Sequence, residues 1–298
     1  MIVNPVASGG RVAKWWPDLR SSLSQYGLQF EDELTCSPRH AIEIARKAVE
    51  DGFRHIVSVG GDGTVHEVVN GLVVDGRVPE DVLLTIIPGG TGADFVRTIG
   101  VSRDPLEACQ ALLGQKTKRV DIGEIRCVRD GQPTTEYFVN VAGLGFDGET
   151  SIRVNRMSKR ISGTIPYLTG LVLTLFTYRN KDVQLSIDGR AVHGRFNSVI
   201  ICNGQYFGGG MWVGPHAAAD DGIFDIVLLK DLGKLEFLVN VPRVYRGTHL
   251  SHPKVESFQA RDLRVEAEQR MFLQAEGELI GEAPASFRVM PHALNLLV

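Results

Sequence analysis

The sequence predicts an α/β protein with an antiparallel, β-rich second half, and two patterns in its 298 residues support this. Through about residue 120, short apolar runs alternate with segments of helical spacing, which predicts a doubly wound parallel sheet. Beyond it, Asp130-Gly131 and Asp188-Gly189 each separate β-rich runs, as hairpin turns do. We therefore expect an α/β domain over residues 1–120, which the segment 286–298 could complete, and a β domain over 121–285.

In the first half, apolar runs predict four strands, at Ile2–Val3, Phe30–Leu34, Ile56–Val59 and Leu83–Ile87. Helices are expected between them, the second of which carries small and apolar residues at helical spacing from Ala41 to Ala48. A last helix should open at Asp104, because an N-cap acid is followed there by proline at the first helical position.

In the second half, short strands are expected near 137–142, 183–187, 191–202, 223–229, 254–260, 263–268 and 271–275. Helices should interrupt them at about 150–178 and 234–246. The longest apolar stretch, Tyr167 to Phe176, is too short to cross a membrane. It could be one buried face of a helix, which we favour, or it could touch a bilayer or an acyl chain.

Composition narrows the class of partner. The formal net charge is −3 and the basic residues are scattered, so we expect no nucleic-acid partner. The four cysteines show no CxxC spacing, which favours reduced thiols over a disulfide framework or a zinc site. The N-terminus shows no basic-then-apolar signal pattern. These features predict a soluble, cytoplasmic protein.

The most distinctive motif is a glycine-rich turn, Gly60-Gly61-Asp62-Gly63-Thr64, which follows the apolar run Ile56–Val59. Glycines let the backbone approach an anion closely, and the helix that follows supplies amide donors. We expect Thr64 to cap that helix. Bound phosphates would repel the carboxylate of Asp62 unless a cation lay between them, so the turn predicts a Mg²⁺-nucleotide site. The alternative is a tight turn that binds no ligand.

Three such turns follow three expected strands, at Asn4 to Gly10, Gly60 to Thr64 and Pro88 to Asp94. In an open parallel sheet, ligands bind outside the carboxyl ends of the strands, so the turns should line one crevice. The turns match neither a Walker A motif nor GxGxxG. They instead offer backbone amides, small hydroxyls such as that of Thr91, and the carboxylates of Asp62 and Asp94. Asp94 could alternatively be a favourable charge at a helix N-terminus.

Further motifs extend over almost the whole chain. In order they are Asn4-Pro5, Gly60-Gly61-Asp62-Gly63-Thr64 with Glu67 and Asn70-Gly71, Pro88-Gly89-Gly90-Thr91-Gly92-Ala93-Asp94-Phe95, Cys202-Asn203-Gly204 to Gly210, Pro215-His216-Ala217, Asp220-Asp221-Gly222-Ile223 and Glu276-Gly277-Glu278. Together they resemble the diacylglycerol kinase catalytic-domain family, and within it the soluble bacterial lipid kinases. NAD kinases and phosphofructokinases share the glycine turn, but not the combination.

The resemblance implies an α/β nucleotide-binding domain joined to a β-sandwich, with ATP and Mg²⁺ in the cleft between them. The implied nucleotide contacts are Asn4, Thr35, Gly61, Asp62, Gly63, Thr64, Glu67 and Thr91. Ala218, Asp221 and Ile223 match a structural Mg²⁺ site, through one carboxylate and two carbonyls. Glu278 matches the proposed acceptor of the alcohol proton, which a kinase acting on an alcohol needs.

Three positions depart from the family's usual pattern. Glu276 stands where aspartate is usual, Ala93 replaces an asparagine, and His66 occupies a position where asparagine is common. His66 could approach the phosphates, although an exposed or capping histidine is favoured. These changes bear on the acceptor and on turnover more than on nucleotide binding.

The sequence thus predicts an ATP- and Mg²⁺-dependent lipid kinase, with diacylglycerol as the leading acceptor and transient peripheral contact with a membrane. A sphingosine-like, ceramide-like or phosphatidylglycerol-like acceptor stays open. So do a kinase of the NAD kinase type, against which the lack of a Ser-Thr-Pro-Thr-Gly-Ser-type segment argues, and a nucleotide-binding regulatory protein without catalysis. The oligomeric state stays open between a monomer and a homodimer.

Overall fold

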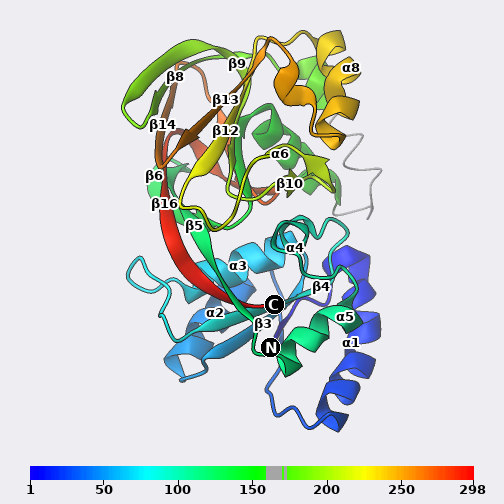
Figure 1. Ribbon diagram of the computed structural model, residues 1–298. Helices are drawn as coiled ribbons and strands as arrows, with labels where there is room; N and C mark the ends of the chain where they lie inside the picture. Colours follow the sequence, from blue (N-terminus) through cyan, green and yellow to red (C-terminus); the bar gives the residue numbers. More distant parts are fainter. Residues whose placement is uncertain (159–169, 171–172) are drawn as a thin grey trace. The chain divides into compact units, whose positions relative to one another are not determined.

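The computed structural model describes residues 1–158, 170 and 173–298 (Figure 1). The chain divides into two compact units. Unit 1 comprises Met1–Val120 and His292–Val298, and unit 2 comprises Asp121–Pro291. The chain thus returns to unit 1 at His292, whereas the sequence pattern places that return at residue 286.

Unit 1 alternates strands and helices. Its elements are β1 (Ile2–Val3), α1 (Ala7–Gln25), β2 (Glu33–Leu34), α2 (His40–Glu50), β3 (His55–Gly60), α3 (Asp62–Leu72), β4 (Leu83–Pro88), α4 (Asp94–Ile99), α5 (Pro105–Ala108) and a 3-10 helix (Cys109–Leu113). The strands form a parallel sheet in the order β16-β4-β3-β1-β2, in which the end of the chain supplies the edge strand β16. Its carboxyl edge therefore collects the turns after β1, β2, β3 and β4.

One strand of unit 1 is shorter than the sequence predicts. Only Glu33 and Leu34 pair with β1, because β1 itself offers two residues, Ile2 and Val3. The preceding residue, Asp32, accepts hydrogen bonds from side chains of α1 instead of joining the sheet. The expected strand over Phe30–Leu34 is therefore wrong for its first three residues.

Unit 2 is built mainly from antiparallel strands. Its elements are β5 (Thr117–Arg129, which starts in unit 1), β6 (Gln132–Phe138), β7 (Val141–Gly145), α6 (Phe146–Ser158), β8 (Lys181–Ile187), β9 (Arg190–Cys202), β10 (Tyr206–Phe207), β11 (Met211–Trp212), β12 (Phe224–Lys230), α8 (Lys234–Tyr245), a 3-10 helix (His249–Ser251), β13 (Val255–Ala260), β14 (Asp262–Ala267), β15 (Phe272–Ala275) and β16 (Glu278–Leu297). Strands β7, β8, β9 and β12 to β15 pair antiparallel around a core that includes Phe138, Phe196, Phe224 and Phe287.

Three hairpins of unit 2 turn through two residues that both have positive φ. Asp130-Gly131 and Asp188-Gly189 link β5 to β6 and β8 to β9, as the sequence predicts. Glu276-Gly277 links β15 to β16 in the same way, with φ angles of 50° and 85°. The sequence pattern missed this third hairpin because glutamate seldom occupies a left-handed position, which aspartate and asparagine tolerate better.

The predicted helical region at 150–178 is only partly described. Helix α6 already begins at Phe146, and the segment 173–177 is helical, but residues 159–169 and 171–172 lie outside the described residues. Leu175 is buried, whereas Leu173 and Phe176 are exposed. Among the described residues, no helix is both long enough and apolar enough to span a bilayer.

Candidate active site

The two glycine turns of unit 1 pack against each other backbone to backbone. The amide of Gly89 donates to the carbonyl of Gly60 at 2.6 Å. A Cβ on Gly90 would lie 2.5 Å from the Cα of Gly61, closer than such atoms approach one another. These positions therefore require glycine for a structural reason, because any side chain would push the turns apart.

The turns after β1 and β2 adjoin the glycine turns along the same sheet edge. The Asn4 amide donates to the carbonyl of Val59, and its side-chain Nδ2 donates to Thr64 Oγ1 at 2.9 Å. The Thr35 amide donates to the carbonyl of Val3. Asn4, Thr35 and Thr64, predicted from widely separated stretches, thus lie at one edge of the sheet.

Helix α3 begins without a side-chain cap. Its N-cap residue is Gly61, in an extended conformation. The expected cap by Thr64 is wrong, because Thr64 lies inside the first turn of the helix and its hydroxyl accepts from Asn4 instead. The first amide groups of a helix largely lack acceptors within it, although the Thr64 amide here donates to the carbonyl of Gly61, and such a terminus favours an anion. The geometry therefore leaves the start of α3 suited to a phosphate.

Asp62 holds the second glycine turn in place. Its Oδ1 accepts from the amides of Asp94 and Phe95 at 3.0 and 3.1 Å, at the start of α4. Ala93, the N-cap residue of α4, has a left-handed backbone and provides no side-chain cap. Asp62, the first residue of α3, caps α4 in its place, so this carboxylate has a structural role whether or not it binds a ligand.

Asp62 and Asp94 also border a common small space. A Cβ on Gly92 would lie 3.0 Å from Asp62 Oδ2 and 3.4 Å from Asp94 Oδ2. Asp94 is buried, with 3% of its surface exposed. Two carboxylates turned to the same space provide oxygen ligands of the kind that Mg²⁺ prefers, so these residues fit the ion that the family implies.

Glu67 accepts hydrogen bonds from amides at the start of α2, as Asp62 does at the start of α4. Its two carboxylate oxygens accept from the amides of Arg39 and Ala41 at 2.9 and 3.2 Å. Its neighbour His66 is only 2% exposed, because this face of α3 is buried. The expected exposed or capping role of His66 is therefore wrong, since the imidazole lies in the interior of unit 1.

Sequence reasoning missed one cation at these turns. Arg103 donates from its guanidinium to the carbonyl of Thr91 at 3.3 Å. Thr91 itself is exposed. Arg103 comes after α4 and belongs to none of the motifs, so no pattern in the sequence signals this contact. A guanidinium at this turn adds positive charge beside the glycine backbone, which suits a polyanionic ligand.

In unit 2, Glu276 and Glu278 lie on the β15–β16 hairpin but have different surroundings. Glu276 Oε1 accepts from the amides of Val139 and Asn140 at 2.9 and 2.8 Å. These bonds tie the hairpin to the turn between β6 and β7, and they offset the strained left-handed backbone of Glu276. Glu278, two residues later, is exposed at the start of β16.

The predicted structural Mg²⁺ residues lie in one turn before β12. Asp221 Oδ1 accepts from the amide of Ile223 at 3.1 Å. Burial raises the pKa of the Asp221 carboxyl above its usual value, and the charges of Asp121 and Asp220 raise it further. A cation there would offset this concentrated negative charge, so the residues fit the ion. In the described part of the chain, no group of three or more His, Cys, Asp or Glu side chains could hold a metal ion.

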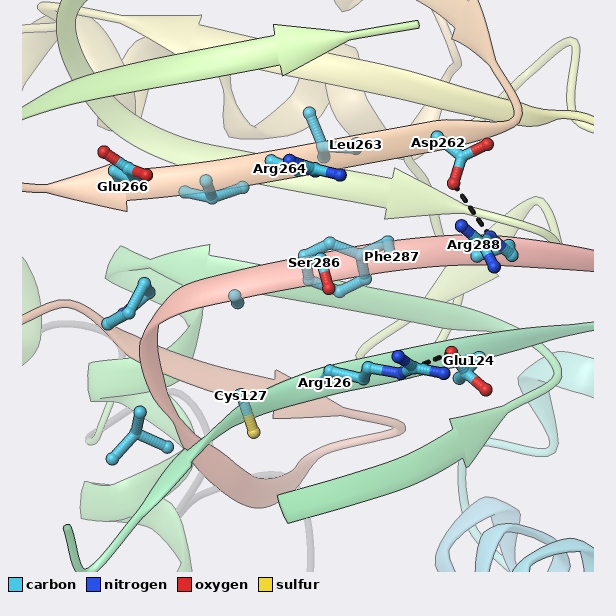
Figure 2. Close-up of a pocket in the computed structure, with 14 residues that line it drawn as sticks. Glu124, Arg126, Cys127, Asp262, Leu263, Arg264, Glu266, Ser286, Phe287 and Arg288 are labelled. Carbon is cyan, nitrogen blue, oxygen red and sulfur yellow. Dashed lines mark hydrogen bonds and ion pairs between the residues drawn. The ribbon is translucent and has the colours of Figure 1, made fainter. Parts of the chain in front are cut away.

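A surface hollow of about 390 Å³ in unit 2 contains none of the predicted site residues. Figure 2 shows the short side chain of Ser286 on β16 between longer charged side chains of β5 and β14. Two arginines lining it pair with neighbouring carboxylates, Arg126 with Glu124 and Arg288 with Asp262. The hollow thus has a balanced charge, and it arises from small residues on a central strand.

Family models match both halves of the chain. The model "Diacylglycerol kinase catalytic domain" matches residues 1–125, and "YegS C-terminal NAD kinase beta sandwich-like domain" matches residues 140–298. These matches confirm the predicted two-domain layout.

Curated relatives cover nearly the whole chain. A diacylglycerol kinase of Bacillus subtilis (strain 168) is 28% identical over 96% of this chain and 91% of its own length. A diacylglycerol kinase of Mycobacterium tuberculosis is 26% identical over 99% of this chain and 93% of its own length.

Solved structures share the fold. A diacylglycerol kinase structure from Bacillus anthracis str. Sterne superposes with a TM-score of 0.70 at 22% identity, covering 99% of this chain and 94% of that chain. Another chain from the same organism reaches a TM-score of 0.78 at 23% identity, covering 99% and 95%. At this identity the likeness concerns the fold alone. The two family matches, by contrast, show that the chain belongs to the diacylglycerol kinase catalytic-domain family and carries a YegS-type, NAD kinase-like β-sandwich as its second domain.

Proposed function

We propose that this chain is an ATP- and Mg²⁺-dependent lipid kinase that transfers the γ-phosphoryl group of ATP to a lipid hydroxyl. Diacylglycerol is the leading acceptor, and phosphatidic acid would be the product. Relatives named diacylglycerol kinase, aligned over almost the full chain, support the class of reaction. The observation that carries the proposal is the start of α3, which has no side-chain cap and forms part of a glycine turn that packs backbone to backbone on the second glycine turn.

Unit 1 would bind the nucleotide mainly through its backbone. The amides at the start of α3 and along the second glycine turn can donate to phosphate oxygens, because the glycines of both turns carry no side chain of their own. Asn4 and Thr64 offer polar groups at the same edge, and Arg103 adds a positive charge beside Thr91. Asp62 and Glu67 act here as positioning residues, because each holds the first amides of a helix.

Mg²⁺, when bound, would offset the negative charge that develops on the transferred phosphoryl group. Asp62 and Asp94 are the residues that we expect to hold it with the nucleotide, because both border the space beside Gly92. In unit 2, Ala218, Asp221 and Ile223 would hold a structural ion.

Glu278 would take the proton of the acceptor hydroxyl. It is exposed, whereas Glu276 is engaged by two buried backbone amides. A base must reach the hydroxyl of a substrate that arrives from outside, so the accessible carboxylate is the better candidate.

The proposal is tested by incubating the pure chain with labelled ATP, Mg²⁺ and a panel of lipids that carry free hydroxyls. The panel should include diacylglycerol, a sphingoid base, ceramide and phosphatidylglycerol, with NAD as the non-lipid control. We expect label in phosphatidic acid. Label in another lipid would change the acceptor, label in NADP would contradict the lipid assignment, and no transfer to any acceptor would leave a nucleotide-binding protein without catalysis.

A further inference from the structure

Helix α8 of unit 2 exposes apolar side chains to solvent, whereas a helix that packs on a core usually turns them inward. None of its residues is fully buried. Leu235, Leu238, Val239 and Tyr245 are exposed, and Leu235 and Val239 show 75% and 68% of their surface. Their spacing of three, four and ten residues places them along one face of the helix. We call these four residues the α8 stripe.

The opposite face of α8 explains why the stripe points outward. Glu236 accepts from Lys254 Nζ at 2.7 Å, and Arg243 donates to Ser251 Oγ at 3.0 Å. Phe237 packs on Phe146 at a ring distance of 4.7 Å. The polar groups facing the body of unit 2 are therefore satisfied, so this orientation of the helix leaves the α8 stripe without a partner in the described part of the chain. Figure 1 shows α8 on the outside of the strands of its unit.

A second exposed apolar group lies beside the start of α8. Lys234 Nζ donates to the carbonyl of Phe176 and lies 6.0 Å from the centre of its ring. Phe176 is 63% exposed and Leu173 is 47% exposed. Lys234 thus brings Phe176 next to Leu235, and a group of exposed apolar side chains marks a surface that another body covers.

Basic side chains lie around this surface, and they favour a partner with negative charge. A hollow of about 210 Å³ beside the start of α8 is lined by Arg179, Arg195 and Lys234 together with apolar side chains such as Leu175. The hydroxyl of Tyr178, which also lines this hollow, is buried and has no hydrogen-bond partner among the described residues.

Arg246, exposed at the other end of the helix, adds a further cation. Four acids lie near these residues. Glu236 pairs with Lys254, and Asp231 lies 3.9 Å from Arg195 and accepts from Asn180. Asp147, which is buried, and Glu149 lie close enough for their charges to act on Tyr178. Among the described residues, Arg179, Lys234 and Arg246 thus bring three positive charges to the surroundings of the α8 stripe in addition to the paired Arg195 and Lys254, against the four acids Asp147, Glu149, Asp231 and Glu236.

We infer that α8, with Leu173 and Phe176, is the surface by which this protein docks on an anionic phospholipid bilayer. Apolar side chains on one helix face, flanked by Lys and Arg, are the features by which helices lie in the bilayer interface. The basic hollow would accept a lipid phosphate, while the α8 stripe enters the acyl boundary. The inference rests on the proposed lipid-kinase function in one respect only, namely that such a kinase must reach a substrate held in a membrane.

The test is co-sedimentation with vesicles of phosphatidylcholine alone or mixed with phosphatidylglycerol, without ATP. The wild-type chain should bind the mixed vesicles. The double variant Leu235→Gln/Val239→Gln should bind them about tenfold less or weaker still, because two apolar side chains no longer enter the bilayer. Its melting temperature should not change, since both side chains are exposed and glutamine is a good helix former. The matched control Leu106→Gln/Leu113→Gln alters two similarly exposed leucines of unit 1 and should bind normally.

A second variant tests the charge. Arg179→Gln/Arg246→Gln should weaken binding to the mixed vesicles by about tenfold and leave binding to neutral vesicles unchanged. Unchanged binding by the α8 variant would overturn the inference, as would a wild-type dimer that this variant converts to a monomer without loss of vesicle binding. Turnover of a short-chain diacylglycerol in free solution should survive the α8 change. If the wild type does not phosphorylate that lipid, diacylglycerol is not the acceptor, while the vesicle result still decides the docking surface.

Discussion

The motif acids of the two units differ in their surroundings. In unit 1, Asp62 and Glu67 both accept from the first amides of a neighbouring helix. In unit 2, Glu276 does the same for the β6–β7 turn, but Glu278 is exposed. Three of these four motif carboxylates thus accept hydrogen bonds from the backbone of another segment. The proposed function accordingly gives phosphate binding in unit 1 to backbone amides and the role of base in unit 2 to the side chain of Glu278.

The largest expected effect belongs to Glu278. Glu278→Gln keeps the size of the side chain but removes its basicity. The phosphoryl-transfer step should therefore slow by about 10²- to 10⁴-fold in single-turnover kinetics, the range typical of the loss of a general base. The dissociation constant for ATP should be nearly unchanged, because the proposed nucleotide contacts all belong to unit 1.

Glu276→Gln is the matched control on the same hairpin. Its amide oxygen can still accept from Val139 and Asn140, so the fold and the turnover should stay close to those of the wild type. A dead Glu276→Gln beside an active Glu278→Gln would transfer the role of base to Glu276 and reverse the comparison.

Asp147 is a buried carboxyl to which we assign neither a backbone-holding role nor the role of base, and it extends the comparison to the core. Burial raises the pKa of Asp147 to about 6, and the hydrogen bond from Gln274 only partly opposes this. Because the folded state holds this proton more tightly than the unfolded state, Asp147 favours folding most below its unfolded pKa. The free energy of unfolding should then fall by roughly 3 kcal/mol as the pH rises from about 4 through about 6.

Denaturant titrations of the wild type and of Asp147→Asn across this range would measure the effect, since asparagine does not titrate. The difference in unfolding free energy between the two proteins should move in favour of the variant as the pH rises. Parallel profiles would show that Asp147 titrates at its ordinary pKa.

Substitutions of Asp62 should change the free energy of unfolding less than the titration of Asp147 does, but they should clearly lower kinase activity. Asp62→Ala removes the cap of α4 and should lower the free energy of unfolding by about 1 kcal/mol. Asp62→Asn can still accept from the two amides, so thermal unfolding should change little, while most kinase activity should disappear with the charge that would hold Mg²⁺. Full activity in Asp62→Asn would contradict a role in Mg²⁺ binding and leave Asp62 only the structural role of capping α4.

The smallest effect concerns the turn before β12. Mg²⁺ without nucleotide should raise the melting temperature of the wild type by mass action, and Asp221→Ala should weaken that response. Asp220→Ala serves as the neighbouring control and should keep most of it. The same Mg²⁺ response in wild type and Asp221→Ala would remove Ala218, Asp221 and Ile223 from the list of metal ligands.

The sequence predicted the features that depend on residues adjacent in the chain, namely the turns and the starts of helices. Gly131 and Gly189 signal hairpins because each follows an aspartate between β-rich runs, and Asp104 with Pro105 signals the start of α5. The Gly61 turn was identified because glycines, an acid and a strand occur together.

Contacts between distant segments left no such signal. Arg103 reaches Thr91 only because α4 folds the chain back, and Asp62 caps a helix 32 residues later. The burial of His66 follows from packing of α3, and the shortness of β2 follows from the two-residue partner β1. The outward face of α8 could not be foreseen either, because Phe146, on which Phe237 packs, and Phe176, whose carbonyl accepts from Lys234, are distant in the sequence.

Hydrogen exchange of the backbone amides, with and without Mg²⁺ and a non-hydrolysable ATP analogue, tests the central claim most directly. If amides bind the phosphates, peptides covering residues 59–66 and 88–95 should gain protection from exchange. In the absence of lipid, peptides covering the β15–β16 hairpin should exchange as before. Protection confined to unit 2, or no protection in either glycine turn at a saturating concentration of the analogue, would contradict the account.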